Sequence, residues 1–329
     1  MQAWIISNVG SGPTLGTIDL PRVEDQQHTS LVQMLMVAVN QVDISVAMGV
    51  FPAGRPKVPY IPGIEGVACI TQSSQFPVGT VVRVSAFRAG YGPNGVMAEY
   101  AVIDNDDIEP IPDGVSPEVV AATGNSALTG WLAMRVRGNV HQGDRALILG
   151  ATGASGWYAM QAARHAGASS VVAVARDAAA LDAALNAGAT ATVQLTPNIG
   201  CDELAEKYRL AAGGEVTITY DALWGLPALA ALTAEAKGAR HVVVGQAAAN
   251  ELNLPCYLIR VKTIDLLGFA NHQIPRLRRH EAMQEMLELS RDGSLDTSKH
   301  TTLSFANLDS AWEQKRTGEC RRPLLRVAQ

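Results

Sequence analysis

Three glycines follow an apolar run at three-residue spacing in residues 146–156, which read ALILGATGASG. These residues suit a strand that turns into a helix: Gly150 allows a tight turn, Gly153 lets the backbone approach a ligand, and Gly156 lets the helix pack against the strand. The start of such a helix offers N–H groups without helical acceptors at the positive end of its dipole, where a pyrophosphate binds. The residues expected to line this site are Gly150, Thr152, Gly153, Ala154, Ser155 and Gly156.

A glycine triplet alone also fits a purely structural turn, so the surrounding elements decide between the two interpretations. Here the triplet follows an apolar run and opens a segment with helical spacing of small and apolar residues. Strands that alternate with helices predict a doubly wound parallel sheet, which favours the dinucleotide site. We expect strands at 145–150, 169–176, 190–195, 215–223, 239–246 and 263–270, and helices at 154–167 and 177–189.

The end of the second expected strand indicates which dinucleotide binds. Enzymes that use NAD commonly carry Asp or Glu there to hydrogen-bond the ribose 2′-hydroxyl. This chain has Ala175 in that place, followed by Arg176 and Asp177. Because a guanidinium matches a phosphate in charge and geometry, we predict NADP(H), with Arg176 at the 2′-phosphate. The alternative is that Arg176 is an ordinary surface residue and that Asp177 only caps the next helix.

Length and composition predict two domains with buried cores, because the chain has 329 residues, of which 47% are hydrophobic and 17% charged. The net charge of −5 argues against a nucleic-acid partner. No apolar run approaches the ~20 residues that cross a bilayer, and we expect neither a secretory signal nor a membrane partner. The scattered cysteines form no metal-binding pair and favour a reduced, cytoplasmic protein: Cys69, Cys201, Cys256 and Cys320.

The first ~120 residues differ from the rest, because short β-branched segments alternate with Gly and Pro and predict a small barrel or distorted sandwich. Ser116 followed by Pro117 predicts a helix start. The chain ends in an expected strand, and we expect this last segment to return to the first domain.

The chain resembles the medium-chain dehydrogenase/reductase superfamily, in particular its zinc-independent quinone oxidoreductase branch, over nearly its whole length. The motifs that carry the resemblance are, in order, VAVNQVDISVAMGVFP, VPYIPGIEGVACI, GVMAEYAVI, ALTGWLAM, GDRALILGATGASG, ARHVVVGQ and TIDLLGFAN. The resemblance implies a GroES-like barrel domain at 1–122, a Rossmann domain at 123–268 and a C-terminal segment at 269–329 that returns to the barrel. It also implies NADPH in the cleft between the domains and a homodimer formed through the Rossmann sheets.

Zinc-dependent relatives place a Cys ligand after the first motif and a Gly-His-Glu at the second. This chain has Asp43-Ile44-Ser45 and Gly63-Ile64-Glu65 instead, so no set of zinc ligands is expected and Glu65 is interpreted as a buried, paired carboxylate. Without a metal to hold an alkoxide, the resemblance favours reduction of a conjugated carbonyl over oxidation of an alcohol.

The resemblance also assigns candidate site residues. Asn40 and Asp43 would face the nicotinamide and substrate, with Asp43 organising its loop. Many relatives carry a Tyr at the position of Ser45, so the proton donor stays open between water and Tyr60, for which simple packing is the alternative. Thr129 would contact the cofactor unless its own helix satisfies its hydroxyl. The remaining expected cofactor contacts are Gly245, Gln246, Phe269, Ala270 and Asn271, and none is assigned to Arg321 or Arg322.

The sequence thus predicts an NADPH-dependent enzyme that transfers hydride to a quinone or an α,β-unsaturated carbonyl compound, a small-molecule substrate. Two alternatives stay open. One is a stand-alone enoyl reductase of a biosynthetic pathway, which shares the chemistry. The other is a non-catalytic protein that retains NADPH binding on the same fold.

Overall fold

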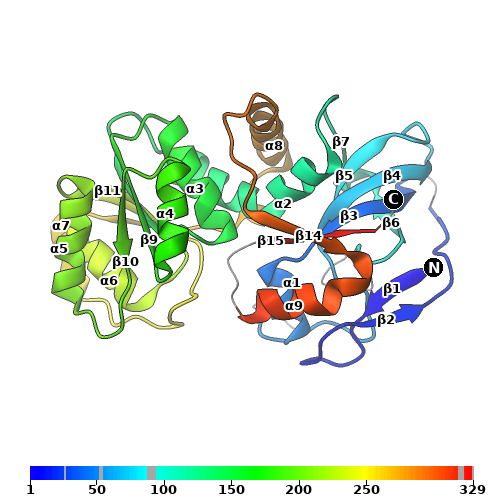
Figure 1. The fold of residues 1–329 in the computed structure, drawn as a ribbon, viewed down its shortest axis with the longest axis horizontal. Coiled ribbons are helices and arrows are strands. Elements are labelled where there is room, and N and C mark those ends of the chain that lie inside the picture. The colour runs from blue at the N-terminus through cyan, green and yellow to red at the C-terminus, as the bar shows by residue number, and fades with distance from the viewer. Residues whose placement is uncertain (26, 52–54, 87–93, 318–321, 328–329) are drawn as a thin grey trace. The chain divides into compact units, whose positions relative to one another are not determined.

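The computed structural model describes residues 1–25, 27–51, 55–86, 94–317 and 322–327. The chain forms two compact units (Figure 1). Unit 1 comprises residues 1–125 and 284–329, and unit 2 comprises residues 126–283. Within the described residues, no helix is both long and apolar enough to span a membrane.

A six-stranded, wholly parallel sheet forms the centre of unit 2 (Figure 1). Its spatial order is β10-β9-β8-β11-β12-β13, so the chain builds outward from β8 in one direction and then in the other. This is the strand order of a Rossmann fold, which confirms the predicted doubly wound sheet. The strands are β8 (Arg145–Leu149), β9 (Ser170–Ala175), β10 (Ala191–Gln194), β11 (Val216–Asp221), β12 (Glu235–Val243) and β13 (Asp265–Gly268).

The helices of unit 2 follow the predicted start and stop signals. Asp177 caps a helix, since its Oδ1 accepts a hydrogen bond from the Ala180 N–H at 3.2 Å. Two of these helices, α5 and α6, pack against the buried side chains of β8, β9 and β10 in one apolar core. The helices are α3 (Ala154–His165), α4 (Ala178–Asn186), α5 (Cys201–Ala212), α6 (Gly225–Ala234) and α7 (Cys256–Lys262), with the short η3 (Ala133–Arg137) and η4 (Asn271–Gln273).

Unit 1 is built on a seven-stranded sheet around one long strand, β3, together with the two-stranded sheet β1-β2. One edge of β3 pairs with β4, while its other edge pairs first with β6 and then with β15. This β-rich unit agrees with the GroES-like domain expected from the sequence. The strands are β1 (Gln2–Ile5), β2 (Thr14–Thr17), β3 (Thr29–Ala38), β4 (Glu65–Gln72), β5 (Val81–Ser85), β6 (Tyr100–Asp104), β7 (Ile108–Pro110), β14 (His300–Ser304) and β15 (Arg322–Arg326).

The C-terminal strand β15 lies between β14 and β3, where Leu324 pairs with Ala38 and Leu325 with Val37. Leu324 and Leu325 are fully buried, so burial of apolar surface holds this segment against the N-terminal strands. The helices of unit 1 are α1 (Gln41–Ala47) and α9 (Leu308–Thr317), with the short η2 (Asn105–Asp107) and η5 (Phe305–Asn307).

Two helices, α2 (Pro117–Leu132) and α8 (Arg276–Arg291), contain the points where the chain passes from one unit to the other. The start of α2 follows its sequence signal, since Ser116 Oγ accepts a hydrogen bond from the Val119 N–H at 3.3 Å and Pro117 opens the helix. The helix is broken at Gly124, whose φ of 9° and ψ of −149° are not helical. A Cβ there would lie 2.5 Å from both Glu65 Oε2 and Arg322 Nη2, so a larger residue would displace these two buried side chains.

Candidate functional site

The glycine turn directly follows β8, at the carboxyl edge of the parallel sheet. Gly150 has a φ of +81°, in the left-handed region that strains any residue with a side chain. The N–H groups of Gly150 and Ala151 donate to the Val174 carbonyl at 3.0 and 3.1 Å, and the Gly153 N–H donates to the Gly150 carbonyl at 3.0 Å. These hydrogen bonds fix the turn against the neighbouring strand β9.

The first turn of α3 crosses directly over this loop at Gly156. A Cβ at Gly156 would lie inside van der Waals contact with the Gly150 carbonyl oxygen, so a larger residue would displace the helix. With Gly153 as the N-cap, the amides of residues 154–156 have no acceptor within the helix. The site lies where the strand order reverses between β8 and β11, which is where such sheets bind ligands. The loop is therefore a cradle that fits a diphosphate.

The end of β9 contains the residues that are predicted to favour NADPH over NADH. Ala175 ends the strand in a buried position, whereas Arg176 is exposed and forms no ion pair within the described parts of the chain. Asp177 is occupied as the cap of α4. Gln194 Nε2 donates to the Arg176 carbonyl at 2.9 Å, which fixes the backbone of Arg176 and leaves its guanidinium available for an anion.

The predicted residues after β12 and β13 also lie along this edge. A Cβ on Gly245 would lie 2.9 Å from the Ala222 carbonyl oxygen, so this glycine is required by the close passage of the loop after β11. Phe269 N–H donates to the Val243 carbonyl at 2.9 Å, which joins the ends of the two strands. Gln246 is exposed, with its Nε2 on Asn250 Oδ1 at 3.0 Å, and Ala270, which follows Phe269, is also exposed.

Two predicted cofactor residues far apart in sequence meet in unit 2. Asn271 Nδ2 donates to Thr129 Oγ1 at 3.0 Å. The Thr129 hydroxyl accepts this hydrogen bond from η4, and its contact with the cofactor stays a prediction. Asn271 is 7% exposed, and this partly buried hydrogen bond holds η4, which follows β13, against α2.

In unit 1, the predicted residues Asn40 and Asp43 are part of a buried polar cluster. Asp43 Oδ2 accepts from the Asn40 N–H at 2.7 Å, and Asn40 Nδ2 donates to Glu65 Oε1 at 3.0 Å. Glu65 forms an ion pair with Arg322 on β15, and Arg322 Nη1 donates to the Ala122 carbonyl at 2.8 Å. This agrees with the interpretation of Glu65 as a buried, paired carboxylate. Arg322 is 1% exposed, so it contributes to the interior of the unit, and Arg321 lies outside the described residues.

The charges of this cluster leave Asp43 in an unusual state. Arg83 lies 3.7 Å from Glu65 and 3.2 Å from Glu109, so both guanidinium groups already face other carboxylates. Burial, and next to it the charge of Glu65, raises the pKa of Asp43 to about 7 despite hydrogen bonds from the backbone of Asn40 and Ile64. The pKa of Asp43 therefore lies near neutral pH. Its carboxyl group accepts the hydrogen bond from the Asn40 N–H at the start of α1.

Tyr60 and Ser45 lie in different environments. Tyr60 is 2% exposed within the apolar core of unit 1, and its hydroxyl has no hydrogen-bond partner among the described residues. Burial, with the charge of Asp43, raises the pKa of its phenol. The environment of Tyr60 favours packing over contact with a substrate. Ser45 Oγ donates back to the Gln41 carbonyl at 3.0 Å within α1.

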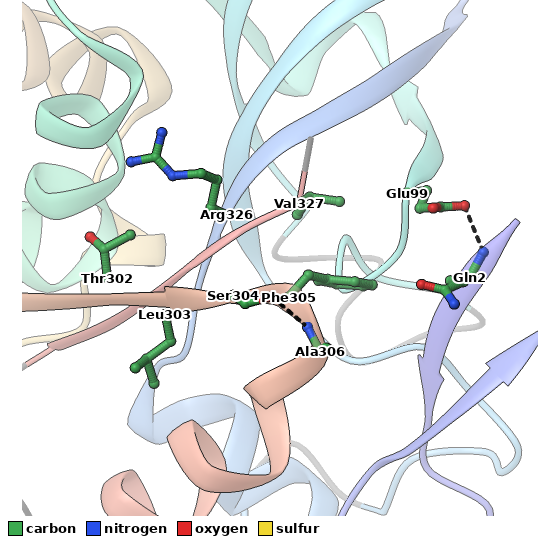
Figure 2. A pocket seen from close by; sticks show the side chains of 9 residues that line it. All are labelled: Gln2, Glu99, Thr302, Leu303, Ser304, Phe305, Ala306, Arg326 and Val327. Atoms are coloured by element: carbon green, nitrogen blue, oxygen red, sulfur yellow. Dashed lines mark hydrogen bonds between the residues drawn. The ribbon is translucent and has the colours of Figure 1, made fainter. Parts of the chain in front are cut away.

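Two further features could mark a site: a cluster of metal-binding side chains and a hollow on the surface. Among the residues that the structure describes, no three His, Cys, Asp or Glu side chains gather in a way that could hold a metal ion. Cys320 lies outside those residues. An open hollow of about 560 Å³ lies on unit 1. At its edge the Gln2 N–H donates to Glu99 Oε2 at 2.7 Å (Figure 2). The hollow is also lined by Thr302, Leu303, Ser304, Phe305, Ala306, Arg326 and Val327.

Sequence reasoning missed the turn after β11. Asp221 ends that strand, is fully buried, and accepts hydrogen bonds at Oδ1 from the N–H groups of Leu223 and Trp224 at 2.8 and 2.9 Å. The signal was present, because an acidic residue ends an apolar run at the carboxyl edge of the predicted sheet. Only the strand order shows that this turn faces the glycine loop.

Two family models match the chain. The alcohol dehydrogenase GroES-like domain matches residues 26–113, and the zinc-binding dehydrogenase family matches residues 154–291. The first range lies in unit 1, and the second covers most of unit 2.

Individual proteins show the same likeness. Quinone oxidoreductase-like protein 2 of Mus musculus is 27% identical over 243 residues, which are 72% of this chain and 66% of that protein. The Bos taurus protein of the same name is 28% identical over 244 residues, 74% of this chain and 68% of that protein. The alignments thus span about two thirds of these relatives. The solved structure of the quinone oxidoreductase from Thermus thermophilus, also described in complex with NADPH, is 25% identical with a TM-score of 0.78, and covers 99% of this chain and 100% of that one.

The titration of Asp43 gives a prediction for stability. The folded state raises the pKa of this carboxyl from 3.8 to about 7, so its contribution to the free energy of unfolding is full below about pH 4 and is lost as the pH rises through 7. Asp43→Asn cannot titrate, so we expect this variant to gain about 3 kcal/mol relative to the wild type between pH 5 and pH 8. Urea denaturation of both proteins at the two pH values measures the change, and a difference that does not vary with pH would contradict it.

Proposed function

The chain belongs to the medium-chain dehydrogenase/reductase superfamily, in its quinone oxidoreductase-like branch, and on this premise we propose that it is an NADPH-dependent reductase of quinones or α,β-unsaturated carbonyl compounds that works without zinc. The observation that carries the proposal is the cradle at Gly156, where the amides that open α3 lie directly over the turn after β8. The likeness to a quinone oxidoreductase described with NADPH supports the choice of cofactor.

We assign the cofactor to unit 2. The diphosphate would rest on the backbone of residues 150–156, and Arg176 would hold the 2′-phosphate through a charge-assisted hydrogen bond. The residues after β12 and β13 would line the nicotinamide end, with Thr129 and Asn271 fixed to each other. In this proposal these residues bind and orient the cofactor, and their positions at the ends of parallel strands support the assignment.

The proposed chemistry follows from what the cofactor supplies. When bound, NADPH supplies a hydride, which adds to a quinone or to the β-carbon of an enone. A proton from the medium completes the reaction, so that one two-electron reduction yields a hydroquinone or a saturated carbonyl compound together with NADP⁺. We assign this proton to water, because Tyr60 is buried in the core of its unit.

Asn40 and Asp43 are assigned a positioning role in this proposal. Each is at most 3% exposed, and both are engaged with backbone or with Glu65. Glu65 pairs with arginines, and no Cys or His stands at the positions where zinc-dependent relatives carry their ligands. These observations support a zinc-free reaction.

We also propose that the protein is a homodimer that forms through unit 2. The edge strand β13 exposes its backbone and Leu266, which is 39% exposed. Next to it in the chain, α7 exposes Tyr257 and Val261 at 58% and 63%. Unpaired strand edges with apolar neighbours favour pairing with another strand, and an isologous pairing of two β13 strands would cover both features.

The central test is anaerobic stopped-flow with NADPH and a panel of quinones and enones. We expect oxidation of NADPH with at least one acceptor, at a rate that dialysis against a chelator does not change. If NADPH binds but no acceptor is reduced, the chain is a non-catalytic dinucleotide-binding protein. A rate that collapses on chelation and returns with zinc would contradict the zinc-free reaction.

Arg176 provides a test of cofactor choice. We expect Arg176→Ala to lower kcat/KM for NADPH by roughly 10-fold to 100-fold, the range of a hydrogen bond to a charged group, and to leave the value for NADH within about twofold. Arg164→Ala removes another exposed arginine of unit 2, near the end of α3, and serves as the matched control. Equal losses for the two cofactors, or a wild type that prefers NADH, would defeat the assignment.

Sedimentation velocity tests the dimer. We expect the wild type to sediment as a dimer and the double variant Val261→Asp/Leu266→Asp as a folded monomer, because two buried charges would face each other across the pairing. Leu210→Asp alters an even more exposed leucine, 73% exposed on α5, and should stay dimeric. A monomeric wild type, or dissociation by the control substitution, would reject this interface.

A further inference from the structure

Three ionisable side chains meet in the interior of unit 2, and the proposed function has not used them as a group. Asp221, Glu235 and His241 are each fully buried. His241 Nδ1 lies 2.7 Å from Glu235 Oε1, and His241 Nε2 lies 3.2 Å from Asp221 Oδ2. Thr219 Oγ1 donates to Glu235 Oε1 at 2.6 Å. Since a buried charge is tolerated only when it is paired, this group is stable as a set and not as separate residues.

The imidazole holds its charge between two carboxylates. Burial alone would lower the pKa of His241, but the charges and hydrogen bonds of Glu235 and Asp221 outweigh burial and raise it to about 10. The surrounding elements add Lys262 on α7, which donates to the Glu235 carbonyl at 2.7 Å, and the phenols of Tyr208 and Tyr220, whose pKa values burial raises and the charge of Asp221 raises further. His241 therefore donates from both ring nitrogens at neutral pH.

The two carboxylates paired with His241 contact different segments of unit 2. Glu235 lies at the start of β12, and none of its hydrogen bonds within the described residues reaches the turn after β11. Asp221 ends β11 and holds that turn through Leu223 and Trp224. Trp224 has a φ of +60° and a ψ of −169°, a strained conformation that a non-glycine residue keeps only when its surroundings enforce it. The Asp221 carboxylate provides part of that enforcement.

The turn held by Asp221 packs against the glycine turn of the proposed dinucleotide site. A Cβ at Gly150 would contact Leu223 at 3.4 Å and Ala222 at 3.5 Å, so these two side chains pack against the glycine turn. The Ala222 carbonyl accepts from the Ala247 N–H at 3.1 Å, and the Leu223 carbonyl accepts from the Ala248 N–H at 2.8 Å. The same turn thus supports both the loop after β8 and the loop after β12.

We propose that His241 is a positioning residue for the dinucleotide site, acting through Asp221 on the turn 221–224. This inference rests on the proposed function, because it requires that the crevice at β8 and β11 binds NADPH. The charged imidazole orients one oxygen of the Asp221 carboxylate, so that the other oxygen stays aligned with the amides of the turn.

The test compares His241→Gln, which removes both ion pairs of the imidazole, with Glu235→Gln, which removes only the pair with Glu235. We expect His241→Gln to raise the Kd for NADPH at least tenfold, because Asp221 loses its charged partner. Glu235→Gln removes the other carboxylate and should leave the Kd within about twofold, even though it lowers the melting temperature. Isothermal titration measures Kd, and thermal unfolding of the same samples measures stability. Equal effects of the two variants on Kd, or an unchanged Kd in a folded His241→Gln protein, would overturn the proposal.

A pH profile decides the question if His241→Gln does not fold. A charged His241 in the folded state predicts that the wild-type Kd for NADPH rises as the pH approaches and passes 10, and that this rise begins at lower pH in Glu235→Gln, which holds the imidazole proton less tightly. A rise at the same pH in both proteins, or no rise, would reject the proposal. Failure of the wild type to bind NADPH at any pH would instead reject the proposed function.

Discussion

The closeness of α3 to the turn after β8 is the constraint on which the rest of the site depends. No side chain fits between Gly156 and the Gly150 carbonyl, so the helix begins directly above the strand end. This brings three amides and the positive end of the helix to the carboxyl edge of the sheet. The parallel strands β9, β12 and β13 end along the same edge, and they are followed by Arg176, Gly245, Gln246, Phe269, Ala270 and Asn271.

Unit 1 is organised by a different interaction, the buried contact between Glu65 and Arg322. Its two partners are 257 residues apart in the sequence and bring β4 and the C-terminal strand β15 together. A buried ion pair contributes less to stability than its Coulomb energy suggests, because both charges lose their hydration. The ion pair joins these two strands, and a Cβ at position 124 would lie 2.5 Å from both Glu65 Oε2 and Arg322 Nη2.

The sequence predicted most of unit 2, because its signals are local. Apolar runs, the Asp177 cap and the glycine turn each act within a few residues, and the strands that they predict form the observed parallel sheet. In unit 1 only the general character was predictable, since β3 pairs with three strands at different parts of its length. The roles assigned to Asn40, Asp43, Thr129, Arg176 and the other site residues stay predictions.

The contacts that the sequence could not predict join residues far apart in the chain. Arg322 carries no local sign that it would be buried against Glu65, and His241 begins an apolar run in which a histidine has no evident partner. Both depend on carboxylates contributed by other strands. The contact between Thr129 and Asn271 is of the same kind, because it joins residues 142 positions apart.

A crystal structure determined after soaking with NADPH tests the central claim most directly. We expect the diphosphate on the amides of residues 154–156 and the 2′-phosphate within hydrogen-bond distance of the Arg176 guanidinium. A crevice without NADPH under saturating conditions, or a diphosphate bound elsewhere on the sheet, would contradict it.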